Sequence, residues 1–356
     1  MSLENRSTES SEEYRKVENY IIADCTYGLG NRLKCLVSAM RIADRSSRSL
    51  LLFWPKNKFA NCNFSDLFEN KIPEITREGL EVIRNKKDLS EQYEIIDTWR
   101  LLPLPEEDLP RHFARAHPSE TGRNIDFEYE RIPTAIRENI LTYVKKLSPK
   151  QALLGKVEVF SRNFKARTLS VAIRTWIEAP ERSVLFSFER MEALLDQNKD
   201  SDFFVSCDDK NVLEKMIYKY SGRVFFYPKR TRAGDRSSVE GMQDIFCDLL
   251  LLSRSHRMIA SFGSSFPEMA WWFGGCRATV KLVPLRTWFF KIVPAKYPFL
   301  MYCLFHQWHP SPSLYLCLAI RWITRLFQYF SWKFSFFVLK LKQRLSSRKN
   351  FCDAPL

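Results

Sequence analysis

Residues 21–33 read Ile21-Ile22-Ala23-Asp24-Cys25-Thr26-Tyr27-Gly28-Leu29-Gly30-Asn31-Arg32-Leu33, and this stretch decides the fold. An apolar run ends in a Gly-X-Gly turn, and apolar residues at helical spacing follow the turn. The stretch therefore predicts a buried strand, a tight loop and a helix whose N-terminal N–H groups can approach a ligand closely.

The two common ligands of such a turn do not fit this sequence. A dinucleotide-binding turn needs a third glycine, and Leu33 stands at that position. A phosphate-binding P-loop needs Gly-Lys-Ser/Thr, which is absent here. Asn31 and Arg32 follow the glycines instead, and their side chains can reach a phosphate or a hydroxyl. We therefore expect a ligand other than NAD, and no ATPase.

The length and composition indicate a globular protein of two domains. A chain of 356 residues with 45% hydrophobic and 27% charged residues has room for two domains, each with its own core. The nine cysteines are odd in number and scattered, which favours reduced thiols in a cytosolic setting over disulfides or a zinc site. Residues 1–17 are expected to be a disordered lead without the apolar core of a signal peptide.

The positive charge is concentrated at the C-terminal end. Of the net charge of +14, the segment from Lys281 onward contributes +11, from twelve Lys/Arg against Asp353 alone. The same segment holds 18 of the 50 aromatic residues. Residues 286–356 are therefore expected to form a basic, amphipathic helical tail at an anionic membrane interface, without spanning the membrane. The alternative is a helix packed on the protein body; nucleic acid fits the broad apolar face less well.

The remaining chain alternates strands and helices in two sections. In residues 18–155 a strand at 49–54 completes a βαβ unit, a binding loop is expected at 56–70, and weak strands are expected near 77–83 and 93–97. In residues 165–285 strands are expected at 168–174, 203–206, 223–227 and 257–261, with helices at 187–198, 211–220, 243–253 and 265–273. This α/β rhythm predicts two Rossmann-like, doubly wound domains that face a cleft, with an inter-domain connection at 149–166.

Several side chains at strand ends are candidates for ligand binding. Arg174 ends a strand, where its guanidinium can grip a diphosphate, although a structural ion pair is the alternative. Ser265 is expected to cap a helix, with Glu268 completing a capping box; alternatively, Ser264 and Ser265 bind phosphate beside the helix N–H groups.

Acidic residues on or just before two predicted helices are further candidates. Asp244 and Asp248 lie four residues apart, where an acid could accept hydrogen bonds from guanine or could face solvent. Asp209, after the strand at 203–206, is expected to cap the next helix.

The order of these motifs resembles the GDP-fucose-dependent fucosyltransferase superfamily, which includes nodulation fucosyltransferases, α1,6-fucosyltransferases and protein O-fucosyltransferases. The resemblance covers about residues 20–275 and rests on Gly28 to Leu33, on Arg174, and on Asp248, Leu252-Ser253 and Ser264-Ser265-Phe266. It implies a GT-B fold with the acceptor on the N-terminal side and the donor on the C-terminal domain. It also implies an inverting reaction without a metal or other cofactor.

The resemblance also implies roles by position. Arg174 would hold the β-phosphate, Ser264 and Ser265 the diphosphate, Asp248 the guanine, and Asn31 the sugar and leaving group. Gly28, Gly30, Arg32 and Phe266 would line the same nucleotide-sugar site. The family often has a His and an acid where this chain has Ala172 and Ile177. The general base is open between Glu178 and Glu181.

The sequence thus predicts a membrane-associated glycosyltransferase on the cytoplasmic face, which moves fucose or a related sugar from a GDP-sugar to a glycan or lipid-linked acceptor. One alternative is a GT-B transferase that uses another nucleotide sugar. The other is a non-catalytic member that binds glycan or membrane.

Overall fold

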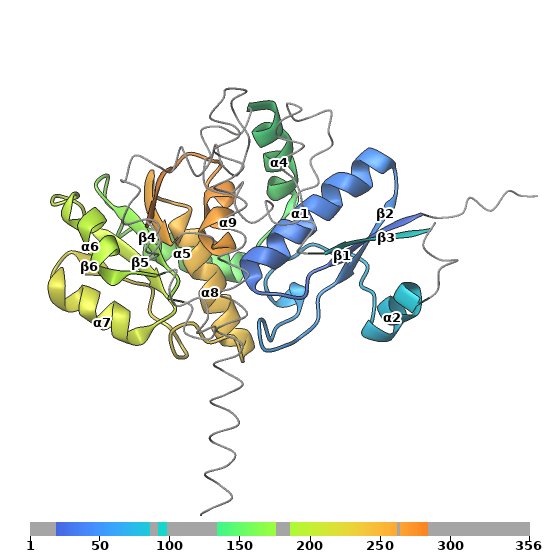
Figure 1. Cartoon of the computed structure of the whole chain (residues 1–356), viewed down its shortest axis with the longest axis horizontal. Coiled ribbons are helices and arrows are strands. Elements are labelled where there is room, and N and C mark those ends of the chain that lie inside the picture. Colours follow the sequence, from blue (N-terminus) through green and yellow to red (C-terminus); the bar gives the residue numbers. More distant parts are fainter. Residues whose placement is uncertain (1–18, 86–91, 98–133, 176–185, 262–263, 284–356) are drawn as a thin grey trace, which may run out of the picture.

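The computed structural model describes residues 19–85, 92–97, 134–175, 186–261 and 264–283. These residues form two sheets, each of parallel strands, with helices between and around the sheets (Figure 1). In the N-terminal sheet, β1 (Tyr20–Asp24) lies between β2 (Ser49–Phe53) and β3 (Tyr93–Asp97), and all three strands are parallel. The helix α1 (Leu29–Ser46) crosses from β1 to β2. The βαβ unit predicted from the glycine turn is therefore confirmed.

The C-terminal sheet has five parallel strands in the order β6-β5-β4-β7-β8. They are β4 (Leu169–Ile173), β5 (Phe203–Cys207), β6 (Val224–Phe225), β7 (Arg257–Ser261) and β8 (Thr279–Val283). The sheet grows from β4 to one side through β5 and β6, and then to the other side through β7 and β8. The order reverses between β4 and β7, which is the position where α/β sheets bind ligands at the carboxyl ends of their strands.

One prediction about local structure was wrong. The segment 77–83, expected as a strand, belongs to the helix α2 (Arg77–Asn85), because Leu80 and Ile83 are spaced to reach the same apolar cluster from one helix face. The segment 149–166, expected to connect the two domains, contains the helix α5 (Gln151–Ser161), which packs against α8 (Val239–Leu252).

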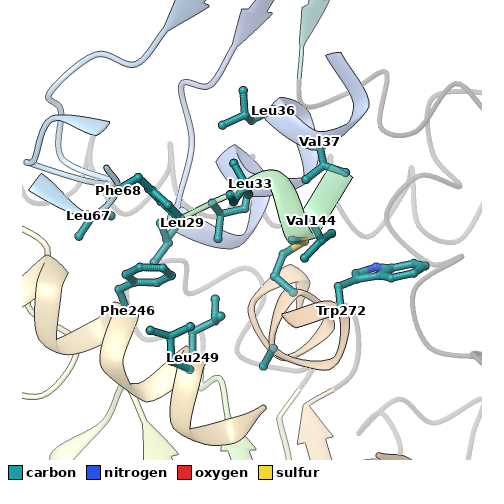
Figure 2. Packing of buried hydrophobic residues seen from close by; sticks show 14 of the residues in the cluster. Leu29, Leu33, Leu36, Val37, Leu67, Phe68, Val144, Phe246, Leu249 and Trp272 are labelled. Carbon is teal, nitrogen blue, oxygen red and sulfur yellow. The ribbon is translucent and has the colours of Figure 1, made fainter. Parts of the chain in front are cut away.

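The chain length suggested that each domain has its own core, but the two domains share one central core. One central cluster of buried residues includes side chains of α1, α8 and α9 (Ser265–Phe273), as well as of α4 (Thr134–Lys146). Figure 2 shows Leu29 and Leu33 of α1 beside Phe246 and Leu249 of α8, with Trp272 of α9 close by. Because this interface is apolar and continuous, the described parts of the two domains share a core.

Smaller clusters cover the outer face of each sheet. Ile22, Phe53 and Leu80 pack on the side of the N-terminal sheet that faces α2. On the outer face of the C-terminal sheet the strands pack against α6 (Phe188–Asp196) and α7 (Lys210–Lys219). The helices α1, α4, α5, α8 and α9 therefore lie between the two sheets (Figure 1).

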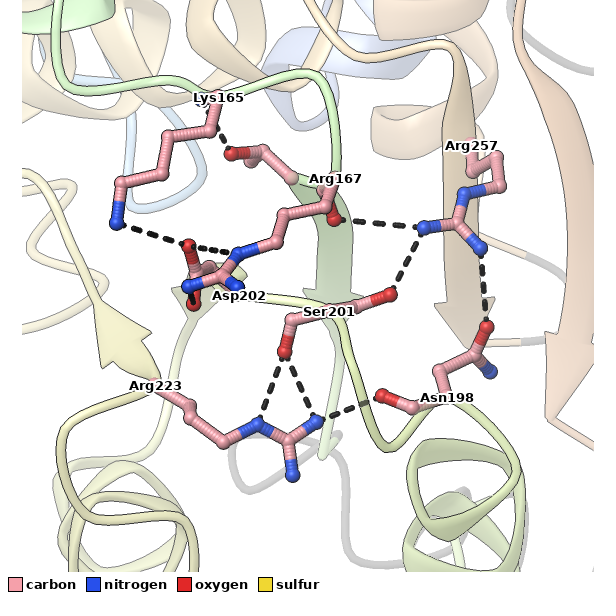
Figure 3. A network of polar contacts seen from close by, with 8 residues as sticks. Lys165, Arg167, Asn198, Ser201, Asp202, Arg223 and Arg257 are labelled. Atoms are coloured by element: carbon pink, nitrogen blue, oxygen red, sulfur yellow. Dashed lines mark hydrogen bonds and ion pairs between the residues drawn. The ribbon is translucent and has the colours of Figure 1, made fainter.

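A polar network joins the amino ends of the C-terminal strands (Figure 3). Arg257 donates to the hydroxyl of Ser201 at 2.8 Å, and Arg223 donates to the carbonyl of Asn198 at 2.6 Å. Asp202 accepts from the Arg167 guanidinium at 3.0 Å. These contacts lie at the edge opposite to the strand ends that hold the candidate site, so they serve the fold.

No helix in the described ranges is long and apolar enough to cross a membrane. Residues 1–17 and the tail 286–356 lie outside the described residues, so the lead and the interfacial helix stay predictions.

Candidate functional site

The glycine turn meets the start of α9 in direct backbone contact. A Cβ atom placed on Gly30 would lie 2.6 Å from the carbonyl carbon of Ser265 and 2.7 Å from the nitrogen of Phe266. Such distances are too short for any side chain, so Gly30 is required for the two helices to touch. A Cβ atom on Gly28 would meet nothing within 4 Å. The two glycines therefore have different tasks, and Gly28 leaves open space at the N-terminus of α1.

Both helices begin without a side-chain cap. Gly28 is the N-cap residue of α1 and has no side chain. The N-cap residue of α9 is Ser264, one position earlier than expected, and its hydroxyl caps no N–H group among the described residues. The first N–H groups of a helix carry partial positive charge and attract anions. The contact at Gly30 and Ser265 brings two such ends together, so this junction favours a negatively charged ligand.

The capping box expected from Ser265 and Glu268 is absent. With Ser264 as the N-cap residue, Glu268 lies too deep in the helix to reach back, and its carboxylate accepts a hydrogen bond from Lys34 of α1 at 2.6 Å. Both side chains are only 1% exposed. The Trp272 indole also donates to this carboxylate, at 3.4 Å. The buried ion pair therefore joins the two domains one helical turn beyond the paired N-termini.

Arg32 supports the turn from within. Its side chain is fully buried. The guanidinium donates to the carbonyls of Tyr27 at 2.5 Å and of Pro55 at 2.8 Å, and it stacks over Trp54 with 4.9 Å to the ring centroid. Burial lowers the pKa of Arg32 to about 10. The expected contact of this guanidinium with a ligand does not fit these neighbours, because the backbone of its own loop surrounds it.

Arg174 stands at the point where the strand order reverses. Its backbone N–H donates to the hydroxyl of Ser261 at 2.9 Å, which ties the end of β4 to the end of β7. Its guanidinium forms an ion pair with Asp208, the residue after β5. Asp208 also accepts from the Thr175 N–H at 2.9 Å. The sequence left open whether Arg174 serves a ligand or an ion pair; it is ion-paired here, at the ligand-binding edge of the sheet.

The two acids of α8 face neither solvent nor an open site. Asp248 lies 2.5 Å from the Lys229 ammonium and accepts from the Ser206 hydroxyl at 2.8 Å. Burial raises the pKa of Asp248. Asp244 forms an ion pair with Arg230 at 2.8 Å. The prediction that these two acids face solvent is therefore wrong. A guanine contact at Asp248 would require Lys229 to move away from the carboxylate.

The loop at 56–70 of the N-terminal domain is hydrogen-bonded to the loop at 226–238 of the C-terminal domain, which lies between β6 and α8. In the predicted binding loop at 56–70, Asn61 donates through its N–H to the carbonyl of Arg236 at 2.9 Å and through its amide to Ser237 at 2.6 Å. The loop at 226–238 also contacts Asp208, since a Cβ atom placed on Gly234, which has a φ of 69°, would lie 3.1 Å from the Asp208 carbonyl oxygen. The expected loop is therefore hydrogen-bonded to the loop that contacts Asp208, the partner of Arg174.

The remaining predicted residues occupy different positions. Asn31 and Phe266 are half-buried at the two helix N-termini, and Asp209 caps α7 as expected. Glu178 and Glu181, the candidate bases, lie outside the described residues, as does Ile177. Among the described residues, no group of three His, Cys, Asp or Glu is arranged to hold a metal ion.

The sequence indicated Asp208, together with Asp209, only as a helix cap, and its ion pair with Arg174 was not predicted. The roles of Lys34, Lys229 and Arg230 were missed, although Lys229 and Arg230 follow the strand predicted at 223–227. These three residues find their partners through contacts between distant parts of the chain.

A pocket of about 290 Å³ lies away from this junction, between α4, α5, α8 and α9. Its lining includes Leu147, Leu154 and Phe273, with Lys145, Arg254 and Arg277 among them. It sits near the C-terminal ends of α4, α8 and α9, where the helix dipoles are negative and basic side chains are favoured. The uncapped helix N-termini described above lie at the other end of α9.

No protein-family model and no curated protein matches the chain. Three kinds of solved structure are similar to it. Fucosyltransferase NodZ from Bradyrhizobium is 18% identical, and the alignment covers 71% of this chain and 92% of that one, with a TM-score of 0.44. A mutant of Arabidopsis thaliana FUT1 in complex with GDP is 13% identical over 74% and 70% of the two chains, with a TM-score of 0.43. POFUT1 in complex with GDP is 12% identical over 75% and 99%, with a TM-score of 0.43.

Proposed function

We propose that this chain is a GT-B glycosyltransferase that moves fucose from GDP-fucose to a glycan or lipid-linked acceptor, with inversion and without a metal ion. The observation that carries the proposal is the meeting of two uncapped helix N-termini at Gly30 and Ser265, in a protein whose C-terminal sheet reverses its strand order beside Arg174. This arrangement suits a diphosphate, and the motifs of the fucosyltransferase superfamily fall on these elements.

In the proposed complex the diphosphate lies across the N-terminus of α9. The hydroxyls of Ser264 and Ser265 and the first N–H groups of the helix donate to its oxygens. Arg174 exchanges part of its contact with Asp208 for the β-phosphate, to which a guanidinium can donate two parallel hydrogen bonds. Asn31, in the first turn of α1, faces the sugar from the N-terminal domain.

The proposed reaction is a single displacement. The acceptor hydroxyl oxygen attacks C1 of the sugar on the face opposite to the diphosphate, and the bond from C1 to the phosphate oxygen breaks. The electron pair of that bond leaves with GDP, and the hydroxyl proton passes to Glu178 or Glu181. Negative charge grows on the diphosphate during this step, and Arg174 and the two helix ends stabilise it because they are already in place.

Without a metal ion, the positive charge at the diphosphate must come from the protein. Replacing Arg174 by Ala is therefore expected to weaken GDP binding about 10- to 100-fold, the range for lost hydrogen bonds to a charged group. Isothermal titration with GDP and release of fucose from GDP-fucose measure the two effects. Arg162→Ala, at an exposed position after α5, is the matched control. If the wild-type chain does not bind GDP, the proposal is wrong.

The donor sugar follows from the same experiment with several donors. Ala172 is buried inside β4 and leaves no polar side chain where the family often has a His. A comparison of GDP-fucose with GDP-mannose therefore tests which sugar is transferred, and a comparison with UDP-glucose tests which nucleotide the donor carries. Turnover of UDP-glucose alone would support the alternative transferase, and glycan binding without turnover of any donor would support a non-catalytic role.

We also propose that the basic, aromatic-rich segment 286–356 holds the protein on the cytoplasmic face of a membrane. The support is its composition, with an excess of Lys and Arg beside many aromatic residues. Truncation after residue 295 should release the protein from sedimenting anionic vesicles. Equal sedimentation of the full and truncated chains would contradict the proposal.

A further inference from the structure

Two aromatic rings lie beside the glycine turn without a place in the core. The ring centroids of Tyr27 and Phe59 are 5.7 Å apart, and the ring planes are tilted by 44°. Both side chains are half-buried. Neither belongs to the hydrophobic clusters that the described residues form. Partly exposed aromatic rings outside the core clusters, next to a ligand-binding turn, suit a binding surface.

The backbone around this pair is held in place by hydrogen bonds. The amide of Asn57 donates to the carbonyl of Thr26 at 2.7 Å, and its oxygen accepts from the N–H of Phe59 at 2.9 Å. The buried guanidinium of Arg32 also donates to that oxygen, at 3.2 Å. Thr26, which precedes Tyr27, and Phe59 itself are thus tied to the Asn57 side chain. The two rings are therefore presented on a fixed frame, which lowers the entropic cost of binding.

The pair lies where an acceptor would enter. Tyr27 directly precedes Gly28, at the open N-terminus of α1, and Asn31 lies in the first turn of that helix. The loop that carries Phe59 reaches the C-terminal domain through Asn61 and Ser237. The rings thus belong to the N-terminal domain, close to the junction of the two helix ends.

The groups around the rings fit a carbohydrate. A pyranose has a face of C–H bonds and a rim of hydroxyls, so one side stacks on the negative face of an aromatic ring while the rim takes hydrogen bonds. The Lys58 ammonium lies 5.2 Å from the centroid of Phe59 and can donate to such hydroxyls, as can the amide of Asn31. We infer that Tyr27 and Phe59 form a platform for one sugar ring of the acceptor glycan. This inference rests on the proposed function, which supplies the donor site next to the platform.

The experiment measures binding of neutral tetrasaccharides to the full chain in the presence of saturating GDP. The probes are cellotetraose, chitotetraose and maltotetraose, followed by saturation-transfer NMR. The dissociation constant of a tetrasaccharide that binds should rise about tenfold in Tyr27→Ala and in Phe59→Ala. Phe59→Leu keeps the apolar bulk but removes the ring, so it should lose affinity as well, whereas Tyr27→Phe keeps the ring and should retain it.

Two control measurements distinguish a sugar-binding role of Tyr27 and Phe59 from a structural role and from a role in donor binding. The dissociation constant for GDP should stay within twofold in every variant, because the rings do not contact the proposed diphosphate groups. Phe226→Ala, at a side chain that is 40% exposed on the other domain, should leave glycan binding unchanged. The inference is wrong if a chain that binds GDP binds none of the three probes, or if binding survives in Phe59→Ala and Phe59→Leu. Failure of GDP binding itself would instead count against the proposed function.

Discussion

Substituting alanine for Gly30 should push the two domains apart at the candidate site. The added methyl group would lie 2.6 to 2.7 Å from backbone atoms of Ser265 and Phe266, and neither backbone can turn away as a side chain could. Overpacking of this kind costs about 1–3 kcal/mol, and alanine returns about 0.5–1 kcal/mol through its higher helix propensity. The difference is about 0–2.5 kcal/mol, and because the clashing atoms belong to the backbone we expect a net loss in its upper part, about 1–2 kcal/mol in the free energy of unfolding.

The assay is urea unfolding followed by tryptophan fluorescence and circular dichroism. A loss of this size lowers the unfolding midpoint by about 0.5 M. The matched control is Gly155→Ala in α5, where the added methyl group meets nothing within 4 Å, so this variant should be slightly more stable than the wild type. Both substitutions place alanine in a helix, so helix propensity changes the free energy of unfolding in the same direction in both. A loss of stability in Gly30→Ala with a gain in Gly155→Ala would therefore be due to the contact at Gly30.

Ligand binding gives a second test of the same contact. If the paired helix ends form the anion site, Gly30→Ala should also weaken GDP binding about tenfold, since both ends move. Gly28→Ala should leave the packing intact, because no atom lies within 4 Å of its Cβ position. The reasoning is refuted if Gly30→Ala unfolds at the wild-type midpoint and binds GDP as tightly.

Two further predictions concern charged groups away from the turn. Lys34→Met should destabilise the protein by about 3–5 kcal/mol in urea unfolding, because the buried Glu268 carboxylate loses its ammonium partner at 2.6 Å. The double variant Lys34→Met with Glu268→Leu should be much closer to the wild type, and equal losses in both would contradict this. Asp202→Asn should cost stability at pH 7 and progressively less as the pH falls below about 4. Burial would raise the pKa of Asp202, but hydrogen bonds from Arg167 and Lys165 lower it, so the carboxylate stabilises the fold fully above the unfolded pKa of about 4 and loses this effect as the pH falls through its lower folded pKa. A loss independent of pH would rule out this role of the charge (Figure 3).

The strands were readable from the sequence because parallel strands between helices are buried on both faces. Such strands appear as short, largely apolar runs, as in 21–23, 169–173 (with Ser170 as the one polar residue) and 203–205. All three lie in strands of the structure. The edge strand β8 was not predicted, because its residues alternate between exposed and covered positions and follow a polar turn. The helix α2 was misread for a related reason, since only Leu80 of its residues is buried.

The partners of charged residues could not be read from the sequence. Lys34 and Glu268 are 234 positions apart, and only the packing of α1 on α9 brings them together. The pattern of Ser265 and Glu268 satisfies a local rule for a capping box, but the fold uses the carboxylate for a contact across the domains. From their spacing, Asp244 and Asp248 were expected to lie on one helix face, either in solvent or in contact with guanine. In the structure, the loop that carries Lys229 and Arg230 covers that face.

The missing third glycine has a physical explanation in this arrangement. In a dinucleotide-binding turn the third glycine lets the helix pack closely on its own sheet. Here Leu33 occupies that position with no exposed surface, and it contributes to the cluster that both domains share. The close approach occurs instead at Gly30, and the surface approached is the backbone of another helix.

The same arrangement determines how mutations should divide between stability and binding. The contact at Gly30, the ion pair of Lys34 with Glu268 and the shared core all fix one distance, that between the N-termini of α1 and α9. Changes at these positions should therefore alter stability and anion binding together. The hydroxyl of Ser264 makes no capping contact among the described residues, so its removal costs the fold little. A ligand that requires Ser264 but tolerates Gly30→Ala would show that it binds α9 alone, and that the glycine turn only supports the fold.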